Sequence, residues 1–354
     1  MKYVSIGGQA VMEGVMMKSS ASLAMAVRRS DGTIVVEKQK IVQKPWRKVI
    51  NKIPLVRGVV AFVSSLISGM VLTSRSAELY GEDMLENEEP TKFEKWLSKT
   101  FHLKLETVAI VLGIVLGLGL SFVLFMFLPS LVSTLISKIF GITVETATVG
   151  VKLLLNIAEG LTKILIFLGY LLAIGFMKDV KRIFMYHGAE HKVISCYEHG
   201  DELTVENARK YSTSHPRCGT SFMFIIMVVG ILVASVTDNL FGLNTATFGA
   251  SLIRLSVKVL LLPVVAGTSY EILKLLAKSD NIIFRILRAP GMLLQKLSTR
   301  EPDDSMLEVS LKSFKTVLVM DGLMEEEKEE TQKEPKEEIK VVDEFCECKE
   351  NDGQ

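Results

Sequence analysis

The sequence predicts a mainly α-helical, multi-pass membrane protein with about four spans and a small cytoplasmic β-hairpin region near the N-terminus. Three observations indicate this fold class. Hydrophobic residues make up 49% of the 354-residue chain, and the mean hydropathy is +0.34, which is too apolar for a soluble domain of this length. Long segments lack any charged residue. The 41 basic and 40 acidic residues are concentrated outside those segments.

Four segments are long and apolar enough to cross a bilayer, which takes about 20 residues of helix. They cover residues 107–137, 153–177, 218–237 and 250–270. The second segment carries Glu159 and Lys163, and the fourth carries Arg254, Lys258 and Pro263. We expect these charged groups to pair within the bundle; a path for an ion or a substrate is the alternative.

The distribution of Lys and Arg predicts the orientation of the spans. Residues 178–217 hold seven basic residues, whereas residues 128–150 hold one and residues 238–249 hold none. Because basic loops tend to stay on the cytoplasmic side, we expect the 178–219 loop and both chain termini to be cytoplasmic. This predicts an even number of crossings.

Residues 58–74 form a fifth apolar segment with two interpretations. They carry no charge and follow Pro54, a residue suited to the first turn of a helix. The segment is only 17 residues long, contains several hydroxyl side chains and has Arg57 and Arg75 at its ends. These features favour an interfacial or re-entrant helix, and crossing of the membrane is the alternative.

The N-terminal region is expected to contain one β-hairpin. Residues 23–29 and 33–41 contain β-branched side chains and flank Asp31-Gly32, a dipeptide typical of tight hairpin turns. Residues 5–17 combine glycines with methionines and fit no phosphate-binding spacing. We interpret them as a turn that packs its methionines; a contribution of Gln9 or Glu13 to an active site is the alternative.

Composition divides the chain into four parts. They are a cytoplasmic N-terminal region with the hairpin and interfacial helix (1–105), a transmembrane region that contains the cytoplasmic loop 178–219 (106–275), a cytoplasmic C-terminal segment (276–323) and an acidic tail (324–354). The tail is rich in Glu and Lys and has no apolar pattern, so we expect it to be disordered.

Histidine residues gather in the loop between the second and third predicted spans. Four of the five histidines lie between residues 187 and 215. His187 and His191 are four residues apart, so on a helix they share one face and can bind one metal ion. The sequence therefore predicts a metal site on this loop.

The chain can return to this pair of histidines. Gly200 predicts the end of a helix, and Thr204 predicts the N-cap of a short one. The return would bring His215 and Cys218 to the same point as third and fourth ligands. Imidazole and thiolate ligands suit a divalent metal ion, zinc best.

The number of ligands decides what the metal would do. Four ligands, His187, His191, His215 and Cys218, would close the site and make it structural. If Cys218 is not a ligand, an open position remains, and Glu190 could act as the catalytic base of a hydrolase. Polar packing of the histidines, with Cys218 as a small buried residue, is the alternative to a metal site.

Four blocks of sequence resemble the YqhQ-like family of bacterial membrane proteins. They are residues 7–17 (GGQAVMEGVMM), 54–58 (PLVRG), 186–192 (YHGAEHK) and 215–222 (HPRCGTSF). This family is of unknown function, and its members are described as predicted metal-dependent enzymes. The resemblance implies that class and a location in the bacterial inner membrane, without a reaction or a ligand assignment. His187, Glu190 and His191 also resemble the H-x-x-E-H pattern of inverzincin metalloproteases, over five residues only.

The preferred function from the sequence is a metal-dependent, zinc-type hydrolase with a cytoplasmic site next to the membrane. A zinc-stabilised scaffold or regulator without enzymatic activity is the second hypothesis, and a transporter is the third. We expect the lipid bilayer as a partner and no nucleic acid. The sequence leaves protein partners and a homo-oligomer open.

Overall fold

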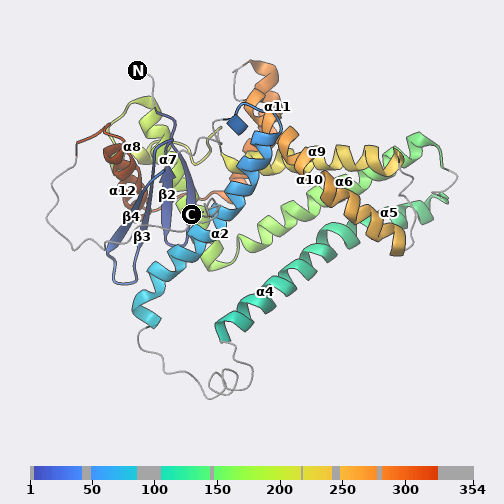
Figure 1. Ribbon diagram of the computed structural model, residues 1–354, viewed down its shortest axis with the longest axis horizontal. Helices are drawn as coiled ribbons and strands as arrows, with labels where there is room; N and C mark the ends of the chain where they lie inside the picture. The colour runs from blue at the N-terminus through green and yellow to red at the C-terminus, as the bar shows by residue number, and fades with distance from the viewer. Residues whose placement is uncertain are drawn as a thin grey trace, which may run out of the picture. The chain divides into compact units, whose positions relative to one another are not determined.

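The computed structural model describes residues 4–41, 49–85, 105–143, 147–216, 218–240, 248–276 and 281–325. The protein is mainly helical, with one small sheet (Figure 1). The strands are β1 (Gly7–Val11), β2 (Gly14–Lys18), β3 (Ser22–Arg28) and β4 (Ile34–Lys40). The helices are α2 (Val56–Leu85), α4 (Leu105–Phe122), the π-helical η1 (Val123–Phe127), α5 (Leu128–Ile139), α6 (Val149–Ile174), α7 (Lys178–His199), α8 (Val205–Arg209), α9 (Gly219–Leu240), α10 (Phe248–Leu276), α11 (Ile282–Ser298) and α12 (Asp304–Met320). Most of the predicted acidic tail, from residue 326, lies outside the described residues.

The strands form one antiparallel sheet in the order β1-β2-β3-β4. The predicted hairpin is confirmed as β3 and β4: Gly32 has φ +87° in its turn, and Asp31 Oδ1 accepts the N–H of Thr33 at 2.8 Å. Strands β1 and β2 were not expected. Residues 5–17, which the sequence suggested form a turn, belong instead to a second hairpin made of β1 and β2. Met12 and Glu13 reverse the chain there, with φ +50° at Glu13.

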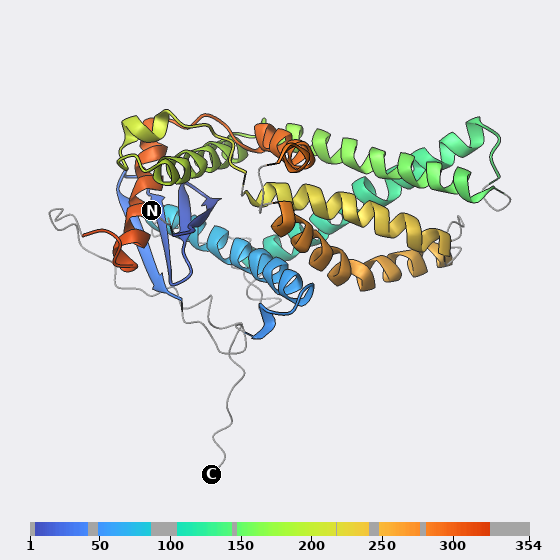
Figure 2. The same ribbon diagram turned by 90° about the horizontal axis from the view of Figure 1, so that it is seen from above.

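The sheet is the middle layer of three. One face packs against α7 and α12, with Met17 and Phe314 in its core. The other face packs against α2, where Met16 and Leu72 are buried together. Met16 and Met17 are neighbours in β2, so their side chains point to opposite faces, as strand geometry requires. Figure 2 shows the strands with α7 and α12 on one side and α2 on the other.

Polar contacts hold the second half of α2 on the sheet. Arg75 donates hydrogen bonds of 2.8 and 3.0 Å to the buried carboxylate of Glu37 on β4. The hydroxyl of Ser76 accepts the N–H of Met12 at 3.1 Å. Near its start, α2 is tied to the end of α10 by an ion pair between Arg57 and Glu271. Part of this apolar helix therefore covers protein surface.

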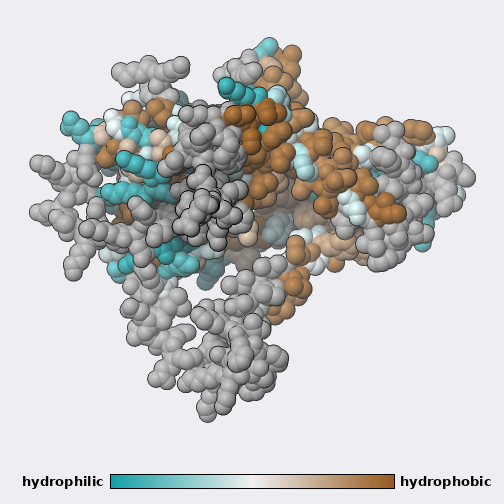
Figure 3. Space-filling model, viewed as in Figure 1, coloured by the Kyte–Doolittle hydropathy of each residue, from teal (hydrophilic) through white to brown (hydrophobic). Residues whose placement is uncertain are grey.

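Five described helical segments are long and apolar enough to cross a membrane. They are Val56–Gly81, Val115–Ile139, Val149–Ile174, Gly219–Asp238 and Ser256–Leu276. The last four match the predicted spans, and the first matches the segment interpreted as interfacial. A count of about four spans and the cytoplasmic orientation stay predictions, because length and composition do not decide whether α2 crosses. Figure 3 shows hydrophobic residues gathered over α9 and α10 and hydrophilic residues over the sheet and α12.

Two pairs of oppositely charged side chains lie inside the described parts of these apolar helices. Lys163 Nζ donates to Glu159 Oε1 at 2.7 Å, one turn away on α6. Lys258 of α10 lies 3.7 Å from the carboxylate of Asp238 on α9. Both contacts agree with the expectation that charges in the bundle pair with one another. The side chain of Arg254 lies outside the described residues.

The chain forms two compact units. One contains Met1–Asp83, Ala173–Phe224 and Ala266–Gln354, and the other contains Met84–Leu172 and Ile225–Val265. The first unit thus joins described N-terminal and C-terminal segments with the histidine-containing loop. It holds the sheet, α7, α8, α11 and α12.

We expect Gly14→Ala to destabilise the unit that holds the sheet by about 1–3 kcal/mol. A Cβ atom at Gly14 would lie 2.2 Å from the carbonyl oxygen of Ala26, which is backbone of the paired strand β3. The thermal unfolding midpoint, followed by circular dichroism in detergent, should fall. Gly7→Ala is the control, since a Cβ atom there meets nothing within 4 Å. Equal midpoints for the two variants would contradict the described packing.

Candidate metal centre

Helix α7 presents two histidines on one face. It starts at Lys178, after a break from α6 in which Met177 is extended, and it ends at Gly200, which has φ +81° as the predicted helix stop requires. His187 and His191 lie one turn apart, with ring centroids separated by 4.5 Å. The helical spacing inferred from the sequence is therefore correct.

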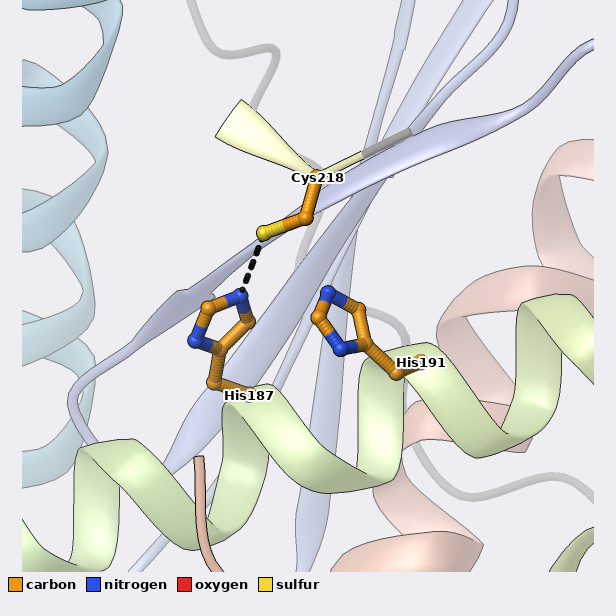
Figure 4. Close-up of side chains that lie close together, drawn as sticks. All are labelled: His187, His191 and Cys218. Carbon is orange, nitrogen blue, oxygen red and sulfur yellow. Dashed lines mark hydrogen bonds between the residues drawn. The ribbon is translucent and has the colours of Figure 1, made fainter. Parts of the chain in front are cut away.

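The segment after α7 returns to these histidines. Thr204 caps α8 as predicted, because its hydroxyl accepts the N–H of Asn207 at 3.3 Å. Cys218 directly precedes α9, and its Sγ lies 3.2 Å from Nε2 of His187. Ligand atoms of His187, His191 and Cys218 all lie within 4.8 Å of one another. Figure 4 shows the three side chains pointing toward a common space.

Two backbone carbonyls determine which nitrogen of each ring is available. His187 Nδ1 lies 2.9 Å from the carbonyl oxygen of Ser298, and His191 Nδ1 lies 2.6 Å from that of Thr213. A carbonyl can only accept, so each Nδ1 carries the hydrogen and each neutral ring presents a lone pair at Nε2. Both Nε2 atoms belong to the group that faces Cys218.

The Nε2 atom of His191 has no hydrogen-bond partner among the described residues, although the side chain is only 1% exposed. A buried acceptor without a partner is costly, because folding removes its hydrogen bonds to water. A bound ion would satisfy it.

The sulfur of Cys218 is held in position by the first turn of α9. It accepts the N–H of Thr220 at 3.4 Å and lies 3.2 Å from the Thr220 hydroxyl. A tetrahedral zinc ion, with bonds of about 2.0 Å to nitrogen and 2.3 Å to sulfur, would separate its ligand atoms by about 3.3–3.5 Å. The separation of 3.2 Å between His187 Nε2 and Cys218 Sγ is close to that value. The donor types and this one separation fit such an ion, and the three ligand atoms all lie within 4.8 Å of one another.

His215 lies near this group and is engaged elsewhere. Its ring centroid is 5.9 Å from that of His191, and its Nε2 is 3.2 Å from the carboxylate of Glu198. Burial, with a smaller effect of His199, lowers the pKa of His215. Of the four ligands predicted from the sequence, the structure brings three together: His187, His191 and Cys218. The fourth, His215, lies beside His191, and its Nε2 contacts Glu198 instead.

Glu190, the predicted catalytic base, is buried between α7 and β1. Its carboxylate accepts the N–H of Gly8, and a Cβ atom at Gly8 would lie 2.7 Å from Cγ of Glu190. Burial raises the pKa of Glu190 to about 7, although nearby His187 and the Gly8 N–H act in the opposite direction. A carboxyl group of this kind can gain or lose a proton near neutral pH.

Several residues that support the cluster were not singled out in the sequence. Gln295 of α11 is fully buried; it accepts the N–H of His215 and donates to the His215 carbonyl, both at 2.9 Å. Because Gly188 has no side chain, the backbone at Arg300 can lie against α7; a Cβ atom at Gly188 would be 2.1 Å from the carbonyl oxygen of Arg300. Gln295 could have been singled out in the sequence, because it is a glutamine on the apolar side of an amphipathic helix. No residue pattern in the sequence marks the backbone carbonyls of Thr213 and Ser298.

The N-terminal glycine and methionine segment also lies against α7. Glu13 forms an ion pair with Arg182 and accepts the hydroxyl of Tyr186 at 3.3 Å. Gln9 points toward Gly69 of α2. Gly8, rather than Gln9 or Glu13, is thus the residue of this segment that contacts the candidate base.

Comparisons with known proteins agree with the resemblance noted in the sequence. The protein described as "Uncharacterized protein YqhQ" of Bacillus subtilis (strain 168) is 36% identical over 323 residues, which cover 90% of this chain and 94% of that protein. No solved structure matches the chain. Residues 53–320 match the family model described as "Protein of unknown function (DUF1385)". The chain therefore belongs to the DUF1385 family of proteins of unknown function.

Proposed function

We propose that this membrane-associated protein is a zinc-dependent hydrolase whose metal ligands are His187, His191 and Cys218. The buried Nε2 of His191, which faces the other two ligand atoms and has no hydrogen-bond partner among the described residues, is the observation that carries the proposal. Two imidazoles and a thiol favour zinc among the common metal ions. The hydrogen bonds from both Nδ1 atoms to carbonyls are the supporting contacts usual around metal-binding histidines.

A catalytic role is favoured by the number of ligands and by Glu190. Three protein ligands are typical of catalytic zinc sites, which keep one position open. A zinc ion held there would supply Lewis-acid chemistry. Glu190 adjoins the ligand His191 in the sequence and is buried near His187, so its carboxylate would accept a proton from the attacking water and return it to the leaving group.

A structural zinc site in a scaffold or regulator is the second candidate. It is favoured by the short distance between His191 and His215, whose ring centroids are 5.9 Å apart. Rotation of His215 away from Glu198 would supply a fourth ligand and close the site. The two candidates therefore differ in what His215 does.

Elemental analysis tests whether the cluster holds zinc. Detergent-purified protein should contain about one zinc ion per chain, as expected for a mononuclear site. His187→Ala/His191→Ala should contain almost none, since two of three ligands are lost. His199→Ala is the matched control, because His199 lies at the end of α7 with Nδ1 bonded to the carbonyl of Ser195 at 2.7 Å. Equal and near-zero zinc in all three proteins would refute the proposal.

His215→Ala distinguishes the catalytic site from the closed structural site. With three ligands the variant should keep its zinc content, and its affinity in a chelator competition should change by less than about tenfold. A closed site would instead lose most of its zinc. That outcome would replace the hydrolase with the scaffold.

Gln295→Ala should lower zinc affinity by about tenfold, a typical effect of removing a group that positions a ligand. Gln295 bonds to both backbone groups of His215, three residues before Cys218, and its Nε2 also lies 3.2 Å from Ser221 Oγ. Competition with a chromophoric chelator measures the affinity. Gln39→Ala on β4 is the control at a distance from the site; equal affinities in both variants would show that Gln295 does not position the ligands.

A further inference from the structure

We propose that α11 lies in the surface of the membrane, where an exposed apolar face enters the lipid layer and basic residues beside it bind anionic phospholipid. The apolar face consists of Ile282, Ile286 and Leu293, and the basic residues are Arg285 and Lys296. This inference does not depend on the proposed hydrolase, because it uses only α11 and the helix ends around it.

One side of α11 is apolar and exposed. Ile282, Ile286 and Leu293 are separated by four and seven residues, so their side chains point in one direction from the helix. Their exposed fractions are 61%, 64% and 60%. Water on such a face costs free energy in proportion to the apolar area, so the face favours an apolar environment. The buried residues of this helix are Gly291, Leu294, Gln295 and Ser298.

Basic residues border the apolar face. α11 contains three basic residues and no acidic residue. Arg285 and Lys296 are exposed, and each follows a member of the apolar face by three residues, which makes them its neighbours on the helix surface. An apolar face with basic residues at its border is typical of helices that bind the surface of anionic membranes.

The ends of two candidate spans bring α11 to the level of the lipid headgroups. α9 begins at Gly219 and α10 ends at Leu276, and the ring centroids of Phe222 and Tyr270 lie 6.4 Å apart. The start of one candidate span is therefore beside the end of the other, on one side of the membrane. α11 begins at Ile282, six residues after Leu276, and six residues of extended chain cover at most about 20 Å.

α11 also contacts the start of α9 directly. A Cβ atom at Gly291 would lie 2.9 Å from Oγ of Ser221, and Nε2 of Gln295 donates to the same oxygen at 3.2 Å. Figure 2 shows α11 nearly end-on, whereas the start of α9 runs across the view. The helix thus crosses the end of the candidate span instead of continuing it, as expected of a helix that lies in the membrane surface.

A lipid surface matches both features of α11, and this decides the occupant. Acyl chains can cover the apolar face, and phosphate groups can accept hydrogen bonds from Arg285 and Lys296. A wholly apolar partner surface would cover the face and offer the two basic groups no opposite charge.

The opposite side of α11 supports the candidate metal centre. Gln295 accepts the N–H of His215, and the carbonyl of Ser298 orients the ring of His187. A helix with its side chains is about 10 Å wide, so the centre lies roughly that far from the lipid contacts. α11 thus connects the surface of the bilayer with the histidines.

Tryptophan fluorescence of the full-length protein in nanodiscs tests the position of α11. The two native tryptophans, Trp46 and Trp96, are replaced by phenylalanine, and Ile286→Trp supplies a single reporter. Lipid brominated in its acyl chains should quench this reporter by about half or more, because an interfacial helix buries its apolar face about 5–10 Å into the lipid. Leu323→Trp is the matched control: Leu323 follows α12, is 51% exposed and should stay unquenched.

The charge of the lipid is tested with brominated phosphatidylglycerol and brominated phosphatidylcholine, each at the same low fraction in unbrominated phosphatidylcholine. The anionic lipid should quench the Ile286→Trp reporter more strongly, since each basic group near the surface favours it by about fivefold. Arg285→Gln/Lys296→Gln should remove this difference. Arg209→Gln/Lys210→Gln removes the same charge outside α11 and should keep it.

Thermal midpoints confirm that the variants fold, and Ile282→Trp is a second reporter on the same face. Absence of quenching at both reporters, or equal quenching at Leu323→Trp, would overturn the proposal, as would equal quenching by the two lipids. A reporter shielded from water only in discs that hold two chains would assign the face to a second copy and overturn it as well. Zinc content is measured separately, so quenching in a protein without zinc would support this proposal and reject the hydrolase alone.

Discussion

Two hydrogen bonds to backbone carbonyls are the constraint on which the candidate centre depends. Ser298 and Thr213 hold the Nδ1 atoms of His187 and His191, so both rings present Nε2 to the same space. If either carbonyl moved, a ring could rotate or change tautomer, and the lone pairs would no longer converge. The end of α11 and the loop before α9 therefore matter as much as the histidines. Gln295 and Gly188 serve the same purpose, since one holds the loop and the other admits the backbone of Arg300.

Glycine at the contact with Glu190 links the sheet to this centre. Gly8 has no side chain, so the carboxylate can approach β1 closely enough to accept its N–H. Burial raises the pKa of this carboxyl group to about 7, although the Gly8 N–H and His187 act in the opposite direction. A larger residue at this position would separate α7 from β1. Gly8, which the sequence suggested was part of a turn, therefore belongs to the packing around the candidate base.

Local rules predicted the parts of the structure that depend on short stretches of chain. Helical periodicity placed His187 beside His191, and the residues at Gly200 and Thr204 marked helix ends correctly. Long apolar segments identified the candidate spans. The errors came from contacts between distant segments. The strands β1 and β2 are five residues each and gain their stability from α7 and α2, while His215 is held by Gln295, 80 residues later. No local pattern carries that information.

The placement of α12 has a consequence for how the protein is made. This helix covers one face of the sheet, and Ser313 Oγ donates to the carbonyl of Ala24 at 3.0 Å, across 289 residues of sequence. During synthesis the four strands leave the ribosome first, yet that face stays open until α12 follows. The carbonyl of Ser298 follows His187 by 111 residues, so both rings are oriented only after α11 has been made. Under the proposed function a zinc ion would therefore bind after α11 has been made, and a chain that lacked α12 would leave one apolar face of the sheet uncovered.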